Sequence, residues 1–173
     1  MNLLEQLIRD ENCILHPYKD SKRIWTIAIG RNLEAEGFSE AEKALMLNVP
    51  LPPYHLPHEC SVHPCPLLIA REDAIMLCNN DINKHSSALR SALPWTDDLD
   101  VVRRCSLINM TFNMGIGVVG GTHGLLSFKD TLALIKGGHY AEAGNHILQS
   151  KFHADTGIRA VRIAKQLETG EWQ

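Results

Sequence analysis

The chain has 173 residues, of which 45% are hydrophobic and 21% are charged, the composition of an ordinary globular domain. Its formal net charge of -3 lacks the basic excess typical of nucleic-acid-binding proteins, so we expect no nucleic-acid partner. No apolar run approaches the roughly 18 residues that span a membrane, and the first residues do not resemble a signal peptide. We therefore expect a cytoplasmic protein without stable membrane insertion.

The N-terminal part predicts a short helix that leads into a β-hairpin. Apolar residues at positions 3, 4, 7 and 8 form a helical stripe over Leu3–Glu11. Further on, Trp25, Ile27 and Ile29 alternate with smaller or polar residues, which indicates a half-buried strand. The residues from 19 to 22 are expected to form the hairpin turn before this strand.

Ser39 and Glu42 have the spacing of a capping box, which predicts a short helix ending near Leu47. Prolines then crowd residues 49–67 and exclude a regular helix or a central strand there. We expect this segment to be an excursion on the surface, because loops of that length are uncommon inside compact domains.

Histidines and cysteines also crowd the 49–67 segment. Zinc binds four Cys or His ligands at such short spacings, so the segment is a candidate structural zinc site. The alternative is an unligated, proline-rich loop, with or without a disulfide between its two cysteines. We expect no other cofactor. The candidate ligands are His55, His58, Cys60, His63 and Cys65.

From Ala70 onward, apolar residues keep helical spacing almost throughout. Ser127 and Asp130 resemble a second capping box, and Gly170 is a typical helix stop. The predicted helices cover about residues 71–93, 101–112, 127–137, 140–149 and 159–167, with a glycine-rich loop over 115–124.

This order of elements predicts an α+β fold. A small N-terminal lobe with the β-hairpin, about residues 12–70, is followed by a linking helix of about residues 71–93. The larger helical lobe, about residues 94–173, is expected to include the helix of residues 1–11 as well.

Two carboxyl groups and a hydroxyl group fall at the helix end and in the hairpin: Glu11, Asp20 and Thr26. Glycoside hydrolysis usually needs two carboxyl groups beside the scissile bond. One of them protonates the leaving oxygen, and the other stays ionised to support positive charge on the sugar or to activate water. A hydroxyl such as that of Thr26 can hold the attacking water. These three residues are therefore the candidate catalytic residues.

The spacing Glu-x8-Asp-x5-Thr resembles that of the phage-type lysozyme family. The N-terminal match is DENCILHPYKDSKRIWTIAIGRNL, and a second match is VVRRCSLINMTFNMG. The third is LSFKDTLALIKGGHYAEAGNHILQSKFHADTGIRAVRIAKQLETGEW, and the three together cover most of the chain except residues 49–67. The resemblance implies a single lysozyme-like domain over residues 1–173, with the two lobes described above.

The resemblance also implies an activity. It points to an endolysin, a muramidase that hydrolyses the β-1,4 bond between N-acetylmuramic acid and N-acetylglucosamine in bacterial peptidoglycan during host cell lysis. In this family Glu11 matches the general acid, Asp20 the second carboxylate and Thr26 the threonine that orients water. Family members resemble inverting enzymes, in which the water lies between the two carboxyl groups.

Three residues of the helical lobe match positions that the family uses to bind substrate. Arg159 matches an arginine that pairs with the catalytic glutamate across the cleft. Asn113 and Phe128 fall where this lobe lines the cleft, and ordinary core packing is the alternative for both.

The sequence departs from the family pattern at three glycines, replaced here by Asn12, Arg23 and Ala28. Asparagine tolerates the left-handed backbone. Arginine at positive φ costs about 1 kcal/mol or more, so we expect a reshaped turn at Arg23, and we expect the methyl group of Ala28 to crowd its neighbour. Arg31 replaces a histidine found in many relatives, and it is expected to form an ion pair with Asp81.

Two alternative functions remain open. A lytic transglycosylase needs chiefly the acidic glutamate, although the presence of Asp20 and Thr26 favours hydrolysis. A homologue that binds the cell wall with little or no catalysis is the other, because the glycine replacements surround the site. The expected partners are glycan strands and a holin-like protein that releases a monomeric enzyme from the host cytoplasm to the cell wall.

Overall fold

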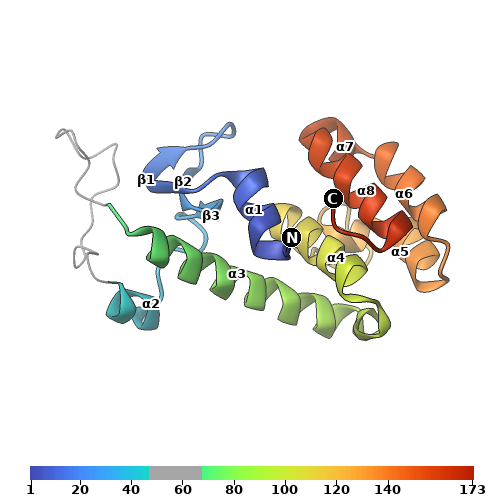
Figure 1. Cartoon of the computed structure of the whole chain (residues 1–173), viewed down its shortest axis with the longest axis horizontal. Coiled ribbons are helices and arrows are strands. Elements are labelled where there is room, and N and C mark those ends of the chain that lie inside the picture. The colour runs from blue at the N-terminus through green and yellow to red at the C-terminus, as the bar shows by residue number, and fades with distance from the viewer. Residues whose placement is uncertain (47–67) are drawn as a thin grey trace. The chain divides into compact units, whose positions relative to one another are not determined.

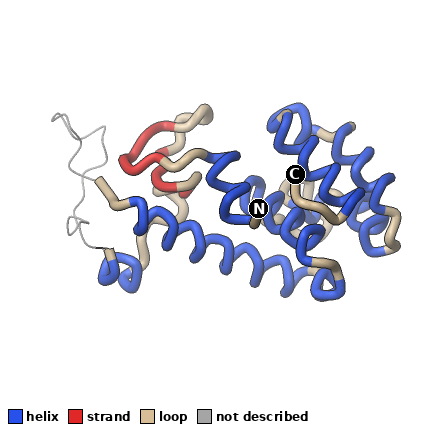
Figure 2. Tube along the Cα trace, viewed as in Figure 1, coloured by secondary structure: helices blue, strands red, loops and turns tan. Residues whose placement is uncertain are grey.

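The computed structural model describes residues 1–46 and 68–173. The candidate zinc ligands, in the segment from His55 to Cys65, lie outside the described residues. The chain divides into two compact units. We call Leu4–Asp81 the N-terminal unit, and Met1–Leu3 with Ile82–Gln173 the C-terminal unit. The strands of the described segments all belong to the N-terminal unit, and helices dominate the rest, so the predicted α+β class is confirmed (Figure 2).

The first helix and the hairpin form as the sequence predicts (Figure 1). Helix α1 spans Leu3–Glu11, and strands β1 (Ile14–Lys19), β2 (Trp25–Ala28) and β3 (Arg31–Asn32) form an antiparallel sheet in the order β1-β2-β3. The third strand was not predicted, because a strand of two residues has no periodicity to detect.

The pairing of β1 with β2 contains an irregularity. Ile14 faces Ala28 and Tyr18 faces Thr26, so β1 carries two more residues than β2 between these pairs. Pro17 lies in this interval, and proline has no N–H group with which to continue the ladder. The two extra residues form a bulge in β1, and regular pairing resumes where Tyr18 faces Thr26.

Strand β2 is more buried than predicted. Thr26, Ile27 and Ala28 are consecutive and all buried, whereas a half-buried strand would bury alternate residues. The physical reason is that Ala28 has a φ of 59° and leaves the extended conformation, so Ile27 and Ala28 both enter the same core cluster. Phe38 and Leu77 are members of this cluster as well.

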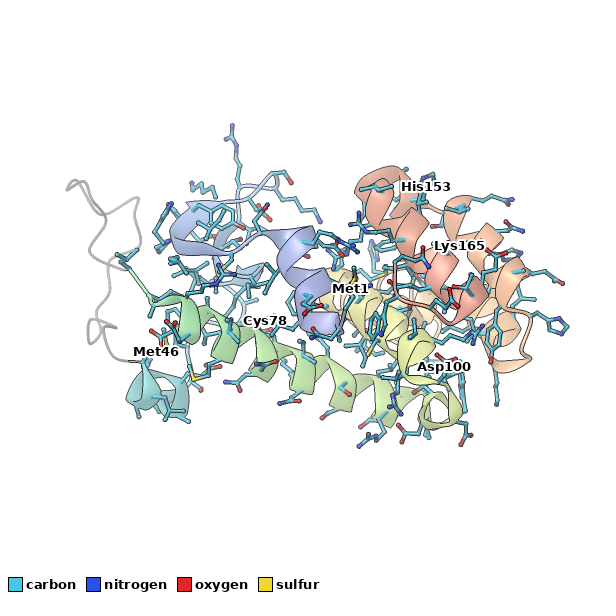
Figure 3. The ribbon with its side chains drawn as sticks, viewed as in Figure 1. Met1, Met46, Cys78, Asp100, His153 and Lys165 are labelled. Carbon is cyan, nitrogen blue, oxygen red and sulfur yellow. The ribbon has the colours of Figure 1, made fainter. Side chains whose placement is uncertain are left out.

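Helix α2 (Glu40–Leu45) begins with the predicted capping box. The Ser39 hydroxyl accepts a hydrogen bond from the Glu42 amide at 3.2 Å, and the Glu42 carboxylate accepts one from the Ser39 amide at 2.8 Å. Helix α3 (Arg71–Ala92) follows, with Cys78 on its buried side (Figure 3). No helix among the described residues is long and apolar enough to cross a membrane.

The C-terminal unit is helical. Helix α8 packs against α4, α6 and α7, and α5 packs against α6. Fully buried aliphatic side chains such as Leu107, Ile147 and Ile163 form its interior. Its helices are α4 (Val101–Met114), α5 (Lys129–Lys136), α6 (Tyr140–Leu148), α7 (Lys151–Thr156) and α8 (Ile158–Thr169), with short 3-10 helices at Pro94–Asp98 and Leu125–Ser127.

Two sequence predictions in this unit were wrong. Ser127 does not cap α5, because its hydroxyl donates to the Gly124 carbonyl at 2.7 Å inside the preceding 3-10 turn, and Phe128 takes the N-cap position without a side-chain bond. Helix α7 was missed. Ser150 caps it, and a serine cap before a short apolar pattern was the signal that could have found it.

Candidate active site

Glu11 is the last residue of α1, and its side chain lies against Gly30, in the turn between β2 and β3. A Cβ atom placed on Gly30 would lie 2.9 Å from Glu11 Cγ and 3.0 Å from Glu11 Oε2. Gly30 also has a φ of 69°, which L residues rarely adopt. The Glu11 carboxyl group therefore occupies space that exists only because position 30 has no side chain.

Asp20 lies at the end of β1, where the chain turns into β2. Its Oδ1 accepts hydrogen bonds from the amides of Lys22 and Ile24, each at 2.8 Å. The Arg23 amide donates to the Asp20 carbonyl at 2.9 Å, and the Asp20 amide donates to the Ile24 carbonyl at 3.0 Å. Backbone amides thus hold this carboxylate in one orientation.

Thr26 is connected to Asp20 through the Ile24 peptide. The Thr26 hydroxyl donates to the Ile24 carbonyl at 3.1 Å, and this carbonyl also accepts the Asp20 amide. Because its one O–H donates to the Ile24 carbonyl, the Thr26 oxygen can act toward other groups only as an acceptor, through its two lone pairs. Thr26 itself is only 5% exposed, so its position is fixed by packing as well.

Tyr18 is a neighbour of all three candidate catalytic residues, and sequence reasoning missed it. It faces Thr26 in the β1–β2 register. Burial raises the pKa of its phenol, and the negative charges of Glu11 and Asp20 raise this pKa further. Its place two residues before Asp20 was the available signal, since alternate residues of an extended chain share a face. Tyr18 therefore lies near both the end of α1, at Glu11, and the hairpin residues Asp20 and Thr26.

The three replaced glycines keep the backbone that glycine favours. Asn12 has a φ of 64°, Arg23 of 64° and Ala28 of 59°. The expectation for Asn12 is confirmed, but the expected reshaping at Arg23 was wrong. A three-residue hairpin loop needs a left-handed residue at its third position, and the hydrogen bonds around Asp20 enforce it. The Ala28 methyl group is buried in the core cluster.

The exposed left-handed arginine predicts a simple stabilising change. Replacement Arg23→Gly should raise the free energy of unfolding by about 0.5–1 kcal/mol, because it removes the strain of an L residue at positive φ. Urea unfolding followed by circular dichroism measures this. Lys22→Gly in the same loop is the control and should lower stability, since Lys22 does not have a positive φ. Equal effects of the two changes would contradict the prediction.

The expected pair between Arg31 and Asp81 is confirmed at 3.2 Å, and Arg31 also makes a second ion pair that was not predicted. Its two terminal nitrogens each lie 3.0 Å from one carboxylate oxygen of Glu42, and its Nε donates to the Gly37 carbonyl at 2.9 Å. The Asn80 amide donates to Glu42 at 2.9 Å. A buried charge network thus joins α2 and α3 to the strand that follows Gly30.

The cysteines of the described segments, Cys13, Cys78 and Cys105, are free thiols. Burial raises the pKa of Cys78 to about 12, and the charges of Asp81 and Glu11 and the nearby Cys13 add to the effect. Cys78 is therefore a protonated core thiol at neutral pH. Within residues 1–46 and 68–173, no group of three or more His, Cys, Asp or Glu side chains is arranged to hold a metal ion.

The three candidate substrate-binding residues lie in the C-terminal unit. Arg159 is 6% exposed, and its Nε donates to Asn109 Oδ1 on α4 at 2.8 Å. Asn113 is exposed one turn further along α4. Phe128 is partly buried and packs edge to face against Phe152, with ring centroids 6.5 Å apart. Asn109 was missed, because a buried asparagine within an apolar helix pattern gives no signal of its partner.

No family model matches this chain. Two curated proteins of Dictyostelium discoideum are similar to it over nearly its whole length. "Probable T4-type lysozyme 1" is 26% identical over 172 residues, which cover 98% of this chain and 95% of that protein. "Probable T4-type lysozyme 2" is 29% identical over 178 residues, with the same coverage of 98% and 95%. The chain thus combines an α+β fold with a similarity to T4-type lysozymes that extends over nearly its whole length.

Proposed function

We propose that this protein is a muramidase, a glycoside hydrolase that cuts the β-1,4 bond between N-acetylmuramic acid and N-acetylglucosamine in bacterial peptidoglycan. The observation that carries the proposal is the arrangement of the N-terminal unit. Glu11 lies against the backbone of Gly30, while Ile24 holds both other residues: its amide donates to the Asp20 carboxylate, and its carbonyl accepts the Thr26 hydroxyl. The similarity to T4-type lysozymes supports the same assignment.

In this proposal Glu11 is the general acid that protonates the leaving glycosidic oxygen. A general acid acts only when its carboxyl group is held within hydrogen-bonding reach of that oxygen. The Glu11 side chain lies against the backbone of Gly30, which excludes positions of the carboxyl group on that side. The restriction lowers the entropy that is lost when substrate and acid are aligned.

Asp20 and Thr26 have the complementary task of placing a water molecule. The Asp20 carboxylate is fixed by two amide hydrogen bonds and can accept a proton from water as it attacks. The Thr26 hydroxyl donates its hydrogen bond to the Ile24 carbonyl, so its oxygen is an acceptor that can take a hydrogen bond from the same water. In the C-terminal unit, we propose that Arg159, Asn113 and Phe128 bind the glycan strand.

The test is cleavage of purified peptidoglycan by the wild type and by Glu11→Gln. We expect the wild type to reduce the turbidity of a peptidoglycan suspension and Glu11→Gln to be at least about a thousandfold slower, because the acidic proton is lost while the shape is kept. Glu5→Gln on the same helix is the control and should leave the rate unchanged, since Glu5 lies exposed in the first turn of α1. Equal inertness of wild type and Glu11→Gln would end the proposal.

The products separate hydrolysis from the transglycosylase alternative. Hydrolysis leaves reducing N-acetylmuramic acid ends, whereas a lytic transglycosylase leaves anhydro ends. We expect mass spectrometry of the released muropeptides to show reducing ends, because Asp20 and Thr26 offer two fixed oxygen acceptors to an attacking water. If all ends were anhydro ends, a hydroxyl group of the muramic acid itself, and not water, would have displaced the leaving group.

The finer part of the proposal is a role in host cell lysis after release from the cytoplasm by a holin-like partner. Cleavage of the glycan strand is the activity that such a role requires. Cells that produce the protein in their cytoplasm should remain intact until their inner membrane is permeabilised with chloroform, and should then lyse. Cells that produce Glu11→Gln should not lyse under the same treatment.

A further inference from the structure

The loop that holds Asp20 carries two exposed positive charges. Lys22 and Arg23 are both exposed and lie between β1 and β2. The Lys22 amide donates to Asp20 Oδ1 at 2.8 Å, and the Arg23 amide donates to the Asp20 carbonyl at 2.9 Å. Within the described part of the chain, neither of the two side chains forms a hydrogen bond or an ion pair. The loop thus presents an ammonium and a guanidinium group beside the candidate catalytic carboxylate.

Positive charge gathers at this hairpin although the whole chain has a net charge of -3. Three of the six lysines and arginines before residue 47 lie within residues 19–23. Besides the two in the loop, Lys19 places its Nζ 5.1 Å from the centre of the Trp25 ring at the base of the hairpin. Asp20 is the one acid among these five residues, and its Oδ1 already accepts two amide hydrogen bonds. This end of the hairpin therefore attracts anionic groups.

Arg23 occupies a position where the fold favours glycine. Its φ is 64°, which glycine adopts without strain and an L residue does not. Its side chain makes no contact inside the described fold that would offset this strain. Strained residues that a rigid surrounding structure maintains are concentrated at functional sites. The guanidinium group of Arg23 therefore points to a contact with a ligand outside the chain.

The substrate of the proposed reaction carries carboxylates close to the scissile bond. Muramic acid, one of the two sugars joined by that bond, bears a short peptide stem, and the stem has free carboxylates. A strand whose scissile bond lies at Asp20 brings this stem within reach of the long side chains of Lys22 and Arg23. A guanidinium group binds a carboxylate through two parallel hydrogen bonds, and an ammonium group adds a mobile point charge.

We propose that Lys22 and Arg23 form a cationic subsite that binds a carboxylate of the peptide stem and makes the enzyme prefer anionic, stem-bearing glycan strands. The inference rests on the proposed function, which places muramic acid beside Asp20. The two residues determine specificity and are not catalytic, because their charges hold the stem and do not touch the bond that is broken.

The test compares two forms of one substrate. Soluble peptidoglycan strands, freed of phosphate-containing wall polymers, are used as prepared or after their carboxylates have been converted to amides with a carbodiimide and ammonia. We expect the wild type to cleave the untreated strands with a kcat/KM about fivefold higher, as two exposed ion pairs would provide. The double variant Lys22→Gln/Arg23→Gln should cleave both forms at equal rates. If it kept the wild-type preference, the proposal would be overturned.

Arg71→Gln/Lys136→Gln is the matched control. It removes the same two charges at exposed positions, one at the start of α3 and one at the end of α5. This variant should keep the wild-type preference for untreated strands, and loss of the preference would reveal an effect of net charge alone. In about 0.5 M salt the wild-type preference should disappear, because exposed charges are screened. A preference that persisted there would contradict an ionic contact.

A binding measurement separates this inference from the proposed function. In the Glu11→Gln background, fluorescence anisotropy of labelled strands should show a Kd about fivefold weaker when Lys22→Gln/Arg23→Gln is added. Amidated strands should bind both proteins equally. Equal binding of untreated strands would overturn the cationic subsite, as would a difference seen only on walls that retain phosphate polymers. If the wild type cut no strand while the difference in Kd remained, the proposed function alone would fail.

Discussion

Replacement of Gly30 by alanine should lower peptidoglycan cleavage by about 100-fold while the protein stays folded. A Cβ atom at this position meets Glu11 Cγ at 2.9 Å and Oε2 at 3.0 Å, which is closer than real Cβ contacts. The flexible end of the Glu11 side chain is the part that can move away. Its displacement removes the general acid from its position, which explains a large loss of activity for a change of one methyl group.

The same change also strains the backbone, because Gly30 has a φ of 69°. This strain is worth about 1–2 kcal/mol of stability. Gly37→Ala is the matched control, since Gly37 has a φ of 55° and the one neighbour a Cβ would meet is the Leu33 carbonyl oxygen at 3.8 Å. Rates measured at a temperature where both variants are folded should be near wild type for Gly37→Ala only. Equal rates for the two variants would show that Glu11 does not depend on Gly30.

A thermodynamic cycle checks the contact independently of activity. Truncation of Glu11 to alanine removes the atoms that the new Cβ would meet. Gly30→Ala should therefore cost less stability in the Glu11→Ala background than in the wild type. Additive effects of the two changes would contradict a direct contact between the two residues.

Replacement of Arg31 by methionine should have the largest effect on stability. Arg31 is 6% exposed and is paired with two buried carboxylates, those of Glu42 and Asp81. Methionine fills much of the volume but leaves both carboxylates without their cation. Loss of one partner of a buried ion pair costs about 3–5 kcal/mol. Urea unfolding at about pH 7 should show this loss.

The stability that Arg31→Met loses should be smaller in acid than at about pH 7. The direction of the pKa shift of Glu42 gives this pH dependence. Burial by itself raises this pKa, but hydrogen bonds from Asn80 and Ser39 and the charge of Arg31 together hold it below its usual value of 4.5. Because the folded-state pKa is lower than the unfolded one, the network stabilises the wild type above about pH 4.5, and this stability is lost as pH falls through the folded value. The variant lacks one of the interactions that lower this pKa, so its stability should differ less from that of the wild type in acid, where Glu42 becomes protonated.

Arg90→Met is the control for this prediction. Arg90 pairs with Asp97 at 3.0 Å, but its side chain is 65% exposed, and exposed pairs contribute about 0–1 kcal/mol. Its stability curve should follow that of the wild type at both pH values. If Arg31→Met lost no more stability than Arg90→Met, the buried network would not support the fold.

The two predictions concern Gly30 and Arg31, which are adjacent in the chain, so the contacts of Arg31 also restrain the backbone at Gly30. Arg31 begins β3 directly after Gly30 and is tied to α2 and α3 through its carboxylate partners. The buried charge network thus fixes the residue that follows Gly30, and Glu11 lies against Gly30 itself. The proposed chemistry requires that the carboxyl group of the general acid be held in a fixed position.

The sequence by itself determined the elements that depend on short-range patterns. The helical stripe over Leu3–Glu11 and the capping box at Ser39 both act within one or two helical turns, and both formed as predicted. The alternation around Ile27 found β2 for the same reason. The predicted α+β class follows from these elements, because local periodicity decides which faces must be buried.

The positive φ angles of Arg23 and Ala28 were decided only by the tertiary structure. Arginine and alanine both disfavour positive φ, yet the hairpin loop and the core cluster impose it at these positions. Local preference is worth about 1–2 kcal/mol, and the surrounding hydrogen bonds and packing outweigh it. Ser127 failed as a cap for a similar reason, because a nearer carbonyl, that of Gly124, accepted its proton.

Only the tertiary structure revealed the partners of the charged residues as well. Glu42 lies eleven residues from Arg31, and Asn109 lies fifty residues from Arg159. Side-chain pairs at such separations leave no periodic trace in one sequence, since their contact depends on how whole helices pack. The sequence therefore pointed to the residues that carry the chemistry, and the fold supplied the groups that hold them in place.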